Sequence, residues 1–274
     1  MTAHWNYLTD INWAAFDPTK VDPELAKVVR AAALVEYGGG HYADYLCSVF
    51  SDDPEFCQVA RDWAAEEIQH GQALGKWAET VDASYDLEAR YKDFRSGYSL
   101  DTAQQNSVRG SRAGELVARC MVETGTSSYY TAMAEQAAEP VLKQICQHIA
   151  ADELRHYKLF YTHLNHYLQR EPMSLLARLR VALGRIAESE DDELAYAYYA
   201  ANRAEGQAYD RETFSRAYMR RAFGFYRQHH IERVVGMVFK ACGLSPQSLI
   251  YKGASRVAWW SLNRKVKQLE KLAA

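Results

Sequence analysis

Four segments of the chain each carry one glutamate in the middle of an otherwise apolar helical stripe. The segments are residues 23–50, 54–80, 110–138 and 140–170. Stepping through each by three and four residues gives mainly Leu, Val, Ala, Phe, Trp, Cys and Met, as on the buried face of a helix. The glutamates on these stripes are Glu36, Glu67, Glu123 and Glu153. The pattern therefore predicts an all-α bundle with four carboxylates in its core.

Two of these glutamates are followed three residues later by a histidine, His70 and His156. A Glu-x-x-His step covers less than one helical turn, so both side chains project from the same face. Isolated buried carboxylates are costly and must be protonated, paired or bound to metal. One Glu from each of two helices, with Glu-x-x-His from each of the other two, is the ligand set of dinuclear carboxylate bundles. We therefore predict that these six residues bind two metal ions.

The spacing of the predicted ligands supports a paired arrangement. Glu36 and Glu67 are 31 residues apart, and Glu123 and Glu153 are 30 apart. Each helical hairpin would then supply one Glu and one Glu-x-x-His. Mixed carboxylate and imidazole ligands favour iron, as Fe²⁺ or Fe³⁺, with manganese in one position as the alternative. The lack of cysteine among them argues against zinc or an iron–sulfur cluster.

The connections between the four segments predict the topology of the bundle. Short turns join the first segment to the second and the third to the fourth, while residues 81–109 are polar and form a long crossover that could contain a short helix. Two hairpins joined by one crossover is the connectivity of ferritin-like four-helix bundles. We expect one ferritin-like domain over 1–274, with a core at about 23–170 and accessory helices at about 174–274, interrupted near Gly184, Gly206 and 242–245.

Composition excludes several other classes. A net charge of −3 does not suit a nucleic-acid-binding protein. Five cysteines without a Cys-x-x-Cys pair make a disulfide framework or a zinc finger unfavourable. The sequence has no signal peptide pattern and no apolar run of the roughly 20 residues that a membrane span needs. We therefore expect a cytoplasmic protein without a membrane span.

Several neighbours of the ligands are candidates for supporting roles. Asp152 could hydrogen-bond a ligand histidine or be a solvated charge. Thr126 could place a hydroxyl near the metals or bond back to its own helix. Three consecutive glycines after Glu36 could clear space for a substrate, allow a close helix approach or produce a bend. We assign Gly39 and Gly40, with Tyr130 of the third stripe, as candidates for the substrate pocket.

Two short segments of the sequence resemble the metal-binding helices of soluble acyl-carrier-protein desaturases. The segments are ARDWAAEEIQHG and IAADELRHYKLFY, which fit an acidic pair followed by x-Arg-His, with Gln69 where the signature has Arg. The stretch Glu-Thr-Gly-Thr ending at Thr126 resembles the Glu-x-x-Thr of that family. The resemblance covers 23–170 and implies that Thr126 lies by the iron and contributes to oxygen activation. It also implies that Asp152 supports a ligand.

The function expected from the site and the resemblance is an oxygen-activating di-iron oxidoreductase. Such an enzyme oxidises an unactivated C–H bond as a desaturase or hydroxylase, on a fatty acyl or carrier-bound substrate. Its partners would be dioxygen, an external electron donor such as a ferredoxin and, from the resemblance only, a second copy in a homodimer.

Three alternatives are weighed against this function. A ferroxidase or iron-handling protein would share the site, although storage subunits usually lack about 100 extra residues. A radical-generating subunit of the ribonucleotide reductase kind usually has Asp at the position of Glu36 and Tyr at that of Leu74. A metal-free interaction protein would bind no iron and would not be destabilised by replacing the six ligands.

Overall fold

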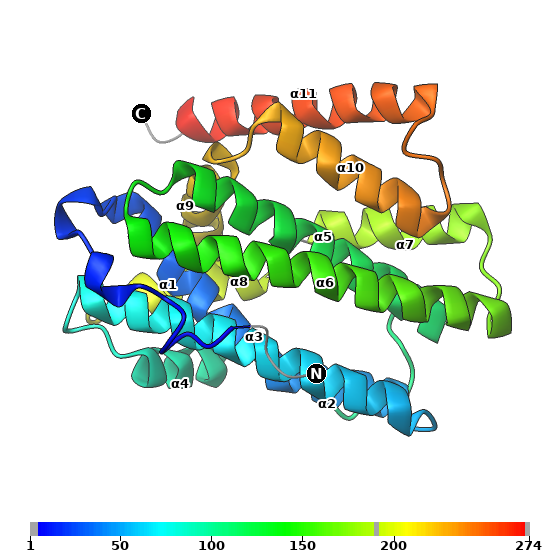
Figure 1. The fold of residues 1–274 in the computed structure, drawn as a ribbon, viewed down its shortest axis with the longest axis horizontal. Coiled ribbons are helices and arrows are strands. Elements are labelled where there is room, and N and C mark those ends of the chain that lie inside the picture. Colours follow the sequence, from blue (N-terminus) through cyan, green and yellow to red (C-terminus); the bar gives the residue numbers. More distant parts are fainter. Residues whose placement is uncertain (1–4, 189–191, 272–274) are drawn as a thin grey trace. The chain divides into compact units, whose positions relative to one another are not determined.

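A computed structural model describes residues 5–188 and 192–271 of the chain. The described residues form helices joined by turns, and no strand occurs among them (Figure 1). This confirms the all-α helical bundle with additional helices toward the C-terminus. No helix among the described residues is both long enough and apolar enough to cross a membrane.

Three of the described α-helices begin at a proline, at Pro23, Pro54 and Pro140. Two short 3-10 helices, η1 and η2, cover Trp13–Ala15 and Pro18–Lys20. The α-helices in the first half are α1 (Pro23–Tyr37), α2 (Gly39–Val49), α3 (Pro54–Val81), α4 (Leu87–Gly97), α5 (Arg112–Gln136) and α6 (Pro140–Arg170). Those that follow are α7 (Leu175–Ala187), α8 (Asp192–Asn202), α9 (Arg211–Gly224), α10 (Gln228–Cys242) and α11 (Leu249–Lys271). The short helix α4 lies in the predicted crossover.

Aspartates directly before a proline begin two of the predicted helices. Asp22 accepts a hydrogen bond from the backbone N–H of Glu24 at 2.8 Å, and Asp53 accepts one from Phe56 at 2.9 Å. These carboxylates satisfy amides that have no partner in the first turn, and proline at the first position needs no such partner. The starts of α1 and α3 are therefore determined by local sequence.

The first predicted helix is interrupted at Gly38. The expected segment 23–50 consists of α1 and α2. Gly38 is the C-cap residue of α1 and the N-cap residue of α2. Gly38 has φ −77° and ψ 0°, and its N–H donates to the carbonyl of Val35 at 3.0 Å. The helix is thus interrupted at the first of the three glycines, two residues after Glu36, and a bend was one of the alternatives open from the sequence.

The chain divides into two compact units, which we describe separately. Unit 1 consists of Met1–Gln105, Ala134–His148 and Glu190–Arg221. Unit 2 consists of Asn106–Met133, Ile149–Ser189 and Ala222–Ala274. Both α5 and α6 contribute one part to each unit. The assignment of one domain over 1–274 stays a prediction.

Unit 1 is built on the pairing of α1 with α3. Helices α2 and α8 also pack against this pair, and α4 packs against α8. Val28, Leu34, Leu74 and Trp77 are fully buried in this unit. The apolar stripes predicted for the first two segments therefore face a core.

In unit 2, α5 lies against α6, and α10 packs against α7 and α11. The Tyr157 hydroxyl of α6 donates to the carbonyl of Met237 in α10 at 2.8 Å, and Arg233 of α10 donates to Ser127 of α5 at 3.1 Å. Figure 1 shows α10 and α11 side by side. The accessory helices after 174 are thus divided between the two units and do not form a unit of their own.

The predicted interruptions after 174 are confirmed at two of three places. Gly206 has φ +74° between α8 and α9, and Gly243 has φ +82° at the end of α10. Both values lie in the left-handed region that glycine adopts most easily. The third helix end lies three residues beyond Gly184, because α7 continues through this glycine to Ala187. An isolated glycine in a helix costs only about 1 kcal/mol, and this amount does not end a helix.

Candidate metal centre

Unit 1 brings together Glu36, Glu67 and His70. Each offers one ligand atom, and these atoms all lie within 4.8 Å of one another. Nδ1 of His70 is 3.7 Å from Oε2 of Glu36 and 4.0 Å from Oε2 of Glu67. All three residues are buried, and His70 has no exposed surface. These N–O separations are longer than an N–H···O hydrogen bond, and a cation about 2 Å from each atom would fit among them.

The backbone of α2 comes very close to this triad. A Cβ built on Gly39 would lie 2.6 Å from Cβ of Glu67 and 3.2 Å from the carbonyl oxygen of Ala64. Real Cβ atoms essentially never come within 3.0 Å of another heavy atom, so only glycine permits this approach. The bend at Gly38 and the bare backbone of Gly39 together fix α2 against the helix that carries Glu67.

A tryptophan from the N-terminal segment covers His70. The ring of Trp5 stacks on His70 with centroids 6.2 Å apart and on His148 with centroids 4.9 Å apart. Trp5 is itself buried. The N-terminal segment therefore limits the rotation of a predicted ligand and keeps water away from it.

Unit 2 repeats the arrangement with Glu123, Glu153 and His156. The ligand atoms of these three residues also lie within 4.8 Å of one another. Nδ1 of His156 is 3.7 Å from Oε2 of Glu123 and 3.9 Å from Oε2 of Glu153. All three residues are about 1% exposed. The two triads thus have the same composition and nearly the same internal distances.

Two side chains of α5 support the carboxylates of this second triad. The Thr126 hydroxyl donates to Oε2 of Glu153 at 2.6 Å and also lies 3.2 Å from the carbonyl oxygen of Val122. Arg119, one turn before Glu123, forms an ion pair with it at 3.7 Å. The hydroxyl has one hydrogen to donate, and its contact with the predicted ligand is shorter than its contact with its own helix.

The remaining predicted residues are placed as follows. Asp152 is buried and accepts a hydrogen bond from Arg155 one turn later. Tyr130 is buried and packs edge-on against Tyr129, with ring centroids 5.3 Å apart. A Cβ on Gly40 would meet only the Cδ1 atom of Ile68, at 3.9 Å. The roles of Asp152, Thr126, Tyr130, Gly39 and Gly40 in catalysis or substrate binding stay predictions.

The chemistry of the donor atoms fits a divalent metal in each triad. Each triad offers two carboxylates and one imidazole nitrogen, which suit iron or manganese better than softer metals. Two buried carboxylates would carry two negative charges when ionised, and one divalent cation would neutralise them. The five cysteines lie outside both triads.

Two buried residues near the triads were missed by sequence reasoning. Arg119 lies four residues before Glu123 on the same face, so helical spacing could have indicated it. Trp5 is far from His70 in sequence, and no local pattern signals that contact. Glu66 is also buried, although it is out of phase with the inner stripe that holds Glu67.

These features define an all-helical protein whose core carries two carboxylate and histidine triads able to hold metal. Residues 48–187, just over half of the chain, match the family model described as Fatty acid desaturase. The chain therefore belongs to the fatty acid desaturase family, which is part of the ferritin-like superfamily. The match contains all the predicted ligands except Glu36. No curated protein is similar enough to count as a match.

Proposed function

We propose that the two triads together bind two iron ions in one dinuclear site. The proposal is supported by the equal composition of the triads and by the family of the chain. Charge supports it as well, because four buried carboxylates would be balanced by two divalent cations. The ligands would be Glu36, Glu67, His70, Glu123, Glu153 and His156, with manganese in one position as the alternative.

The function that this site supports best is oxygen-dependent oxidation of a fatty acyl substrate by a desaturase or hydroxylase reaction. Membership of the fatty acid desaturase family supports a desaturase-type oxidoreductase. The single observation that carries the finer proposal is the duplicated Glu, Glu and His triad in a chain of that family. A di-iron centre would supply, with dioxygen, an oxidant strong enough to remove hydrogen from an unactivated C–H bond.

The residues of the chain would position the site and exclude water from it. The Thr126 hydroxyl donates to Oε2 of Glu153 and so would hold this carboxylate in position for a metal. Arg119 adds a positive charge beside Glu123 and so offsets part of the negative charge of the triad. The ring of Trp5 fixes the orientation of His70. These contacts hold the donor atoms in place before any metal arrives, which lowers the cost of binding.

Metal analysis of matched glutamine variants tests the proposal. Glu67→Gln and Glu153→Gln should each lower bound iron, from about two per chain to one or none. The control is Glu66→Gln, which changes the neighbouring buried carboxylate and should keep the full metal content. An iron-free wild-type protein, or equal metal content in all three variants, would contradict the dinuclear site.

Oxygen consumption by the reduced protein then tests the reaction. With free and carrier-bound fatty acyl substrates, oxygen use should be coupled to the appearance of an unsaturated or hydroxylated acyl product. A ferroxidase would consume oxygen on iron addition and leave every acyl substrate unchanged. Carrier attachment of the substrate, a ferredoxin-type donor, a homodimer and a cytoplasmic location remain part of the proposal.

A further inference from the structure

The last described helix, α11, exposes large apolar side chains to solvent. Leu249 is 84% exposed, Ile250 70%, Val257 65% and Trp260 60%. Their spacing puts them on one side of the helix, because 250, 257 and 260 are separated by steps of seven and three. Single exposed apolar residues are ordinary, but four on one side of a helix within about three turns indicate a surface that contacts a partner.

The opposite side of α11 already provides the packing that the fold needs. Tyr251, Ala254, Ala258 and Leu262 pack against the buried cluster of α10, which contains Ile231, Val235 and Phe239. The Tyr251 hydroxyl also donates to the carbonyl of Glu232 at 3.0 Å. The exposed apolar side chains are therefore not required for the attachment of α11 to unit 2.

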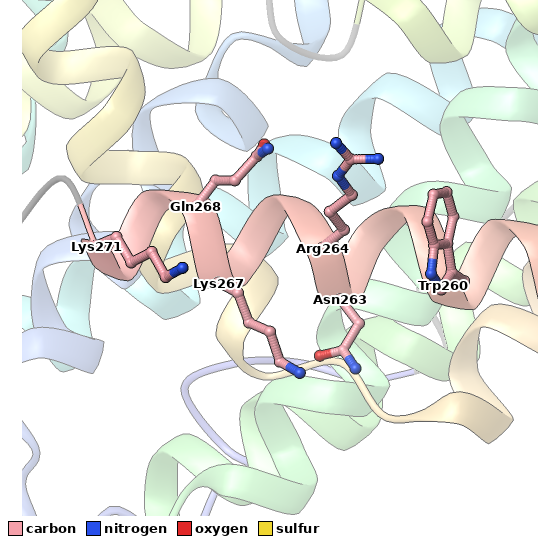
Figure 2. Close-up of a pocket in the computed structure, with 6 residues that line it drawn as sticks. All are labelled: Trp260, Asn263, Arg264, Lys267, Gln268 and Lys271. Carbon is pink, nitrogen blue, oxygen red and sulfur yellow. The ribbon is translucent and has the colours of Figure 1, made fainter.

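The same helix concentrates positive charge. Its basic residues are Lys252, Arg256, Arg264, Lys265, Lys267 and Lys271, and Glu270 is its single acidic residue. The whole chain has a net charge of −3, so this helix differs in sign from the protein as a whole. Trp260, Arg264, Lys267 and Lys271 are among the residues that line a pocket of about 350 Å³. Figure 2 shows their side chains, all of which come from α11.

A second helix of unit 2 has the same character. Helix α7 contains three arginines and no acidic residue. Leu176 is 78% exposed and Leu183 63%, and the exposed Arg180 lies between them on the same face. Both α7 and α11 pack on α10 with their other sides. Basic amphipathic character thus occurs twice in this unit.

A second copy of the chain is a poor occupant for the outer face of α11. A symmetric dimer through this face would bring its basic residues toward those of the other copy. One acidic residue, Glu270, cannot balance six basic ones. The charge instead complements an anionic partner.

The distribution of side chains favours a lipid surface over a folded acidic protein. Exposed Leu, Ile, Val and Trp, with Lys and Arg beside them, are typical of helices that lie in the membrane interface. Trp in particular is enriched at the level of the lipid headgroups.

We propose that the outer face of α11 is a docking surface for a membrane that contains anionic lipids. The apolar half, from Leu249 to Trp260, would enter the boundary between headgroups and acyl chains. The basic half, from Arg264 to Lys271, would contact the anionic headgroups. The protein would then bind the membrane peripherally, from one side.

Vesicle co-sedimentation of the full chain tests this proposal. Vesicles of phosphatidylcholine alone are compared with vesicles that also contain phosphatidylglycerol, at low and high salt. Binding is expected only to the anionic vesicles and should weaken as salt increases. Each Lys or Arg near an anionic surface strengthens binding about fivefold, so Arg264→Gln, Lys267→Gln and Lys271→Gln combined should weaken it about a hundredfold.

Matched controls separate the α11 surface from general effects. The combination Lys92→Gln, Lys143→Gln and Lys158→Gln removes three exposed basic groups elsewhere and should keep the binding. Val257→Ser should weaken binding about tenfold, whereas Leu8→Ser, at a residue 54% exposed in unit 1, should not. Circular dichroism checks that each variant keeps its helices.

Two results would overturn the proposal. One is the absence of binding to anionic vesicles by the wild-type protein. The other is an equal loss of binding in the α11 triple variant and its control. Binding of an acidic protein such as an acyl carrier protein, without vesicle binding, would assign the surface to a protein partner instead.

Discussion

The hydroxyl oxygen of Thr126 lies 2.6 Å from Oε2 of Glu153, so a threonine of α5 donates a hydrogen bond to a predicted ligand on α6. Thr126 is one turn after Glu123, and Glu153 is three residues before His156. One hydroxyl therefore connects the two helices that supply the second triad. Hydrogen bonds of this kind orient a ligand and adjust its basicity.

Removing this hydroxyl should weaken the second triad without unfolding the chain. Thr126→Val keeps the shape of the side chain and should lower metal affinity or activity by about tenfold to a hundredfold. Thr126→Ser restores the donor and should stay within a few-fold of the wild type. Iron titration of both variants is the measurement. Equal metal affinity and turnover in the valine and serine variants would show that the contact has no role in the site.

Gly39 and Gly40 provide a second matched pair of substitutions. A methyl group at Gly39 would lie 2.6 Å from Cβ of Glu67, whereas one at Gly40 would meet Ile68 at an ordinary 3.9 Å. Gly39→Ala should therefore lower the free energy of unfolding by about 1–3 kcal/mol and reduce metal binding. Gly40→Ala should be neutral or stabilise by up to about 1 kcal/mol. Denaturant unfolding of both variants measures the difference, and equal stabilities would contradict the close approach of α2 to Glu67.

Glu139 is a buried carboxylate at the start of α6 and connects three parts of unit 1. It accepts hydrogen bonds from Nε1 of Trp77 at 2.7 Å and from the backbone N–H groups of Leu142, at 2.7 Å, and Asp17, at 3.2 Å. Glu139→Ala leaves these donors buried without an acceptor and should cost about 3 kcal/mol or more.

The control for Glu139 keeps the carboxylate and removes one donor. Trp77→Phe leaves Glu139 bonded to the backbone, so the loss of the Trp77 hydrogen bond should destabilise the fold less than Glu139→Ala does. The variant also replaces a fully buried indole with a smaller ring. Adding Glu139→Ala to Trp77→Phe should then cost less than Glu139→Ala alone. Additive losses would mean that the Trp77 hydrogen bond contributes nothing to the effect.

The parts of the fold that depend on local spacing could be predicted from the sequence. Asp22 and Asp53 each lie directly before a proline and cap α1 and α3, so the starts of these helices follow from local sequence. The phase of Glu67 with His70, and of Glu153 with His156, indicated residues that the structure brings close together in each triad. A helix repeats its geometry every few residues, so such pairs follow from sequence alone.

Other features depend on contacts between distant segments and gave no local signal. The stacking of Trp5 on His70 joins residues 65 positions apart. The three glycines suggested a break at Gly38, but only the structure shows that the backbone of Gly39 lies directly against Glu67. The helix α7 continues through Gly184 because the low helix propensity of one glycine is outweighed by the residues on either side of it.

Cys47 should become reactive only in alkaline solution. Burial, and then its hydrogen bond with Cys57, raises the pKa of the Cys47 thiol to about 11 from an ordinary 9.0. The thiolate is the nucleophile, so alkylation by iodoacetamide should be slow at neutral pH and should increase as the pH approaches 11. In denaturant the same increase should occur near pH 9, because the unfolded thiol has its ordinary pKa.

The raised pKa of Cys47 also means that this thiol stabilises the fold below pH 9 and that the stabilisation is lost as pH rises through 11. The other four cysteines are buried, so Cys47→Ser should remove the reaction seen in the native protein. Rapid alkylation of Cys47 at neutral pH would contradict the raised pKa.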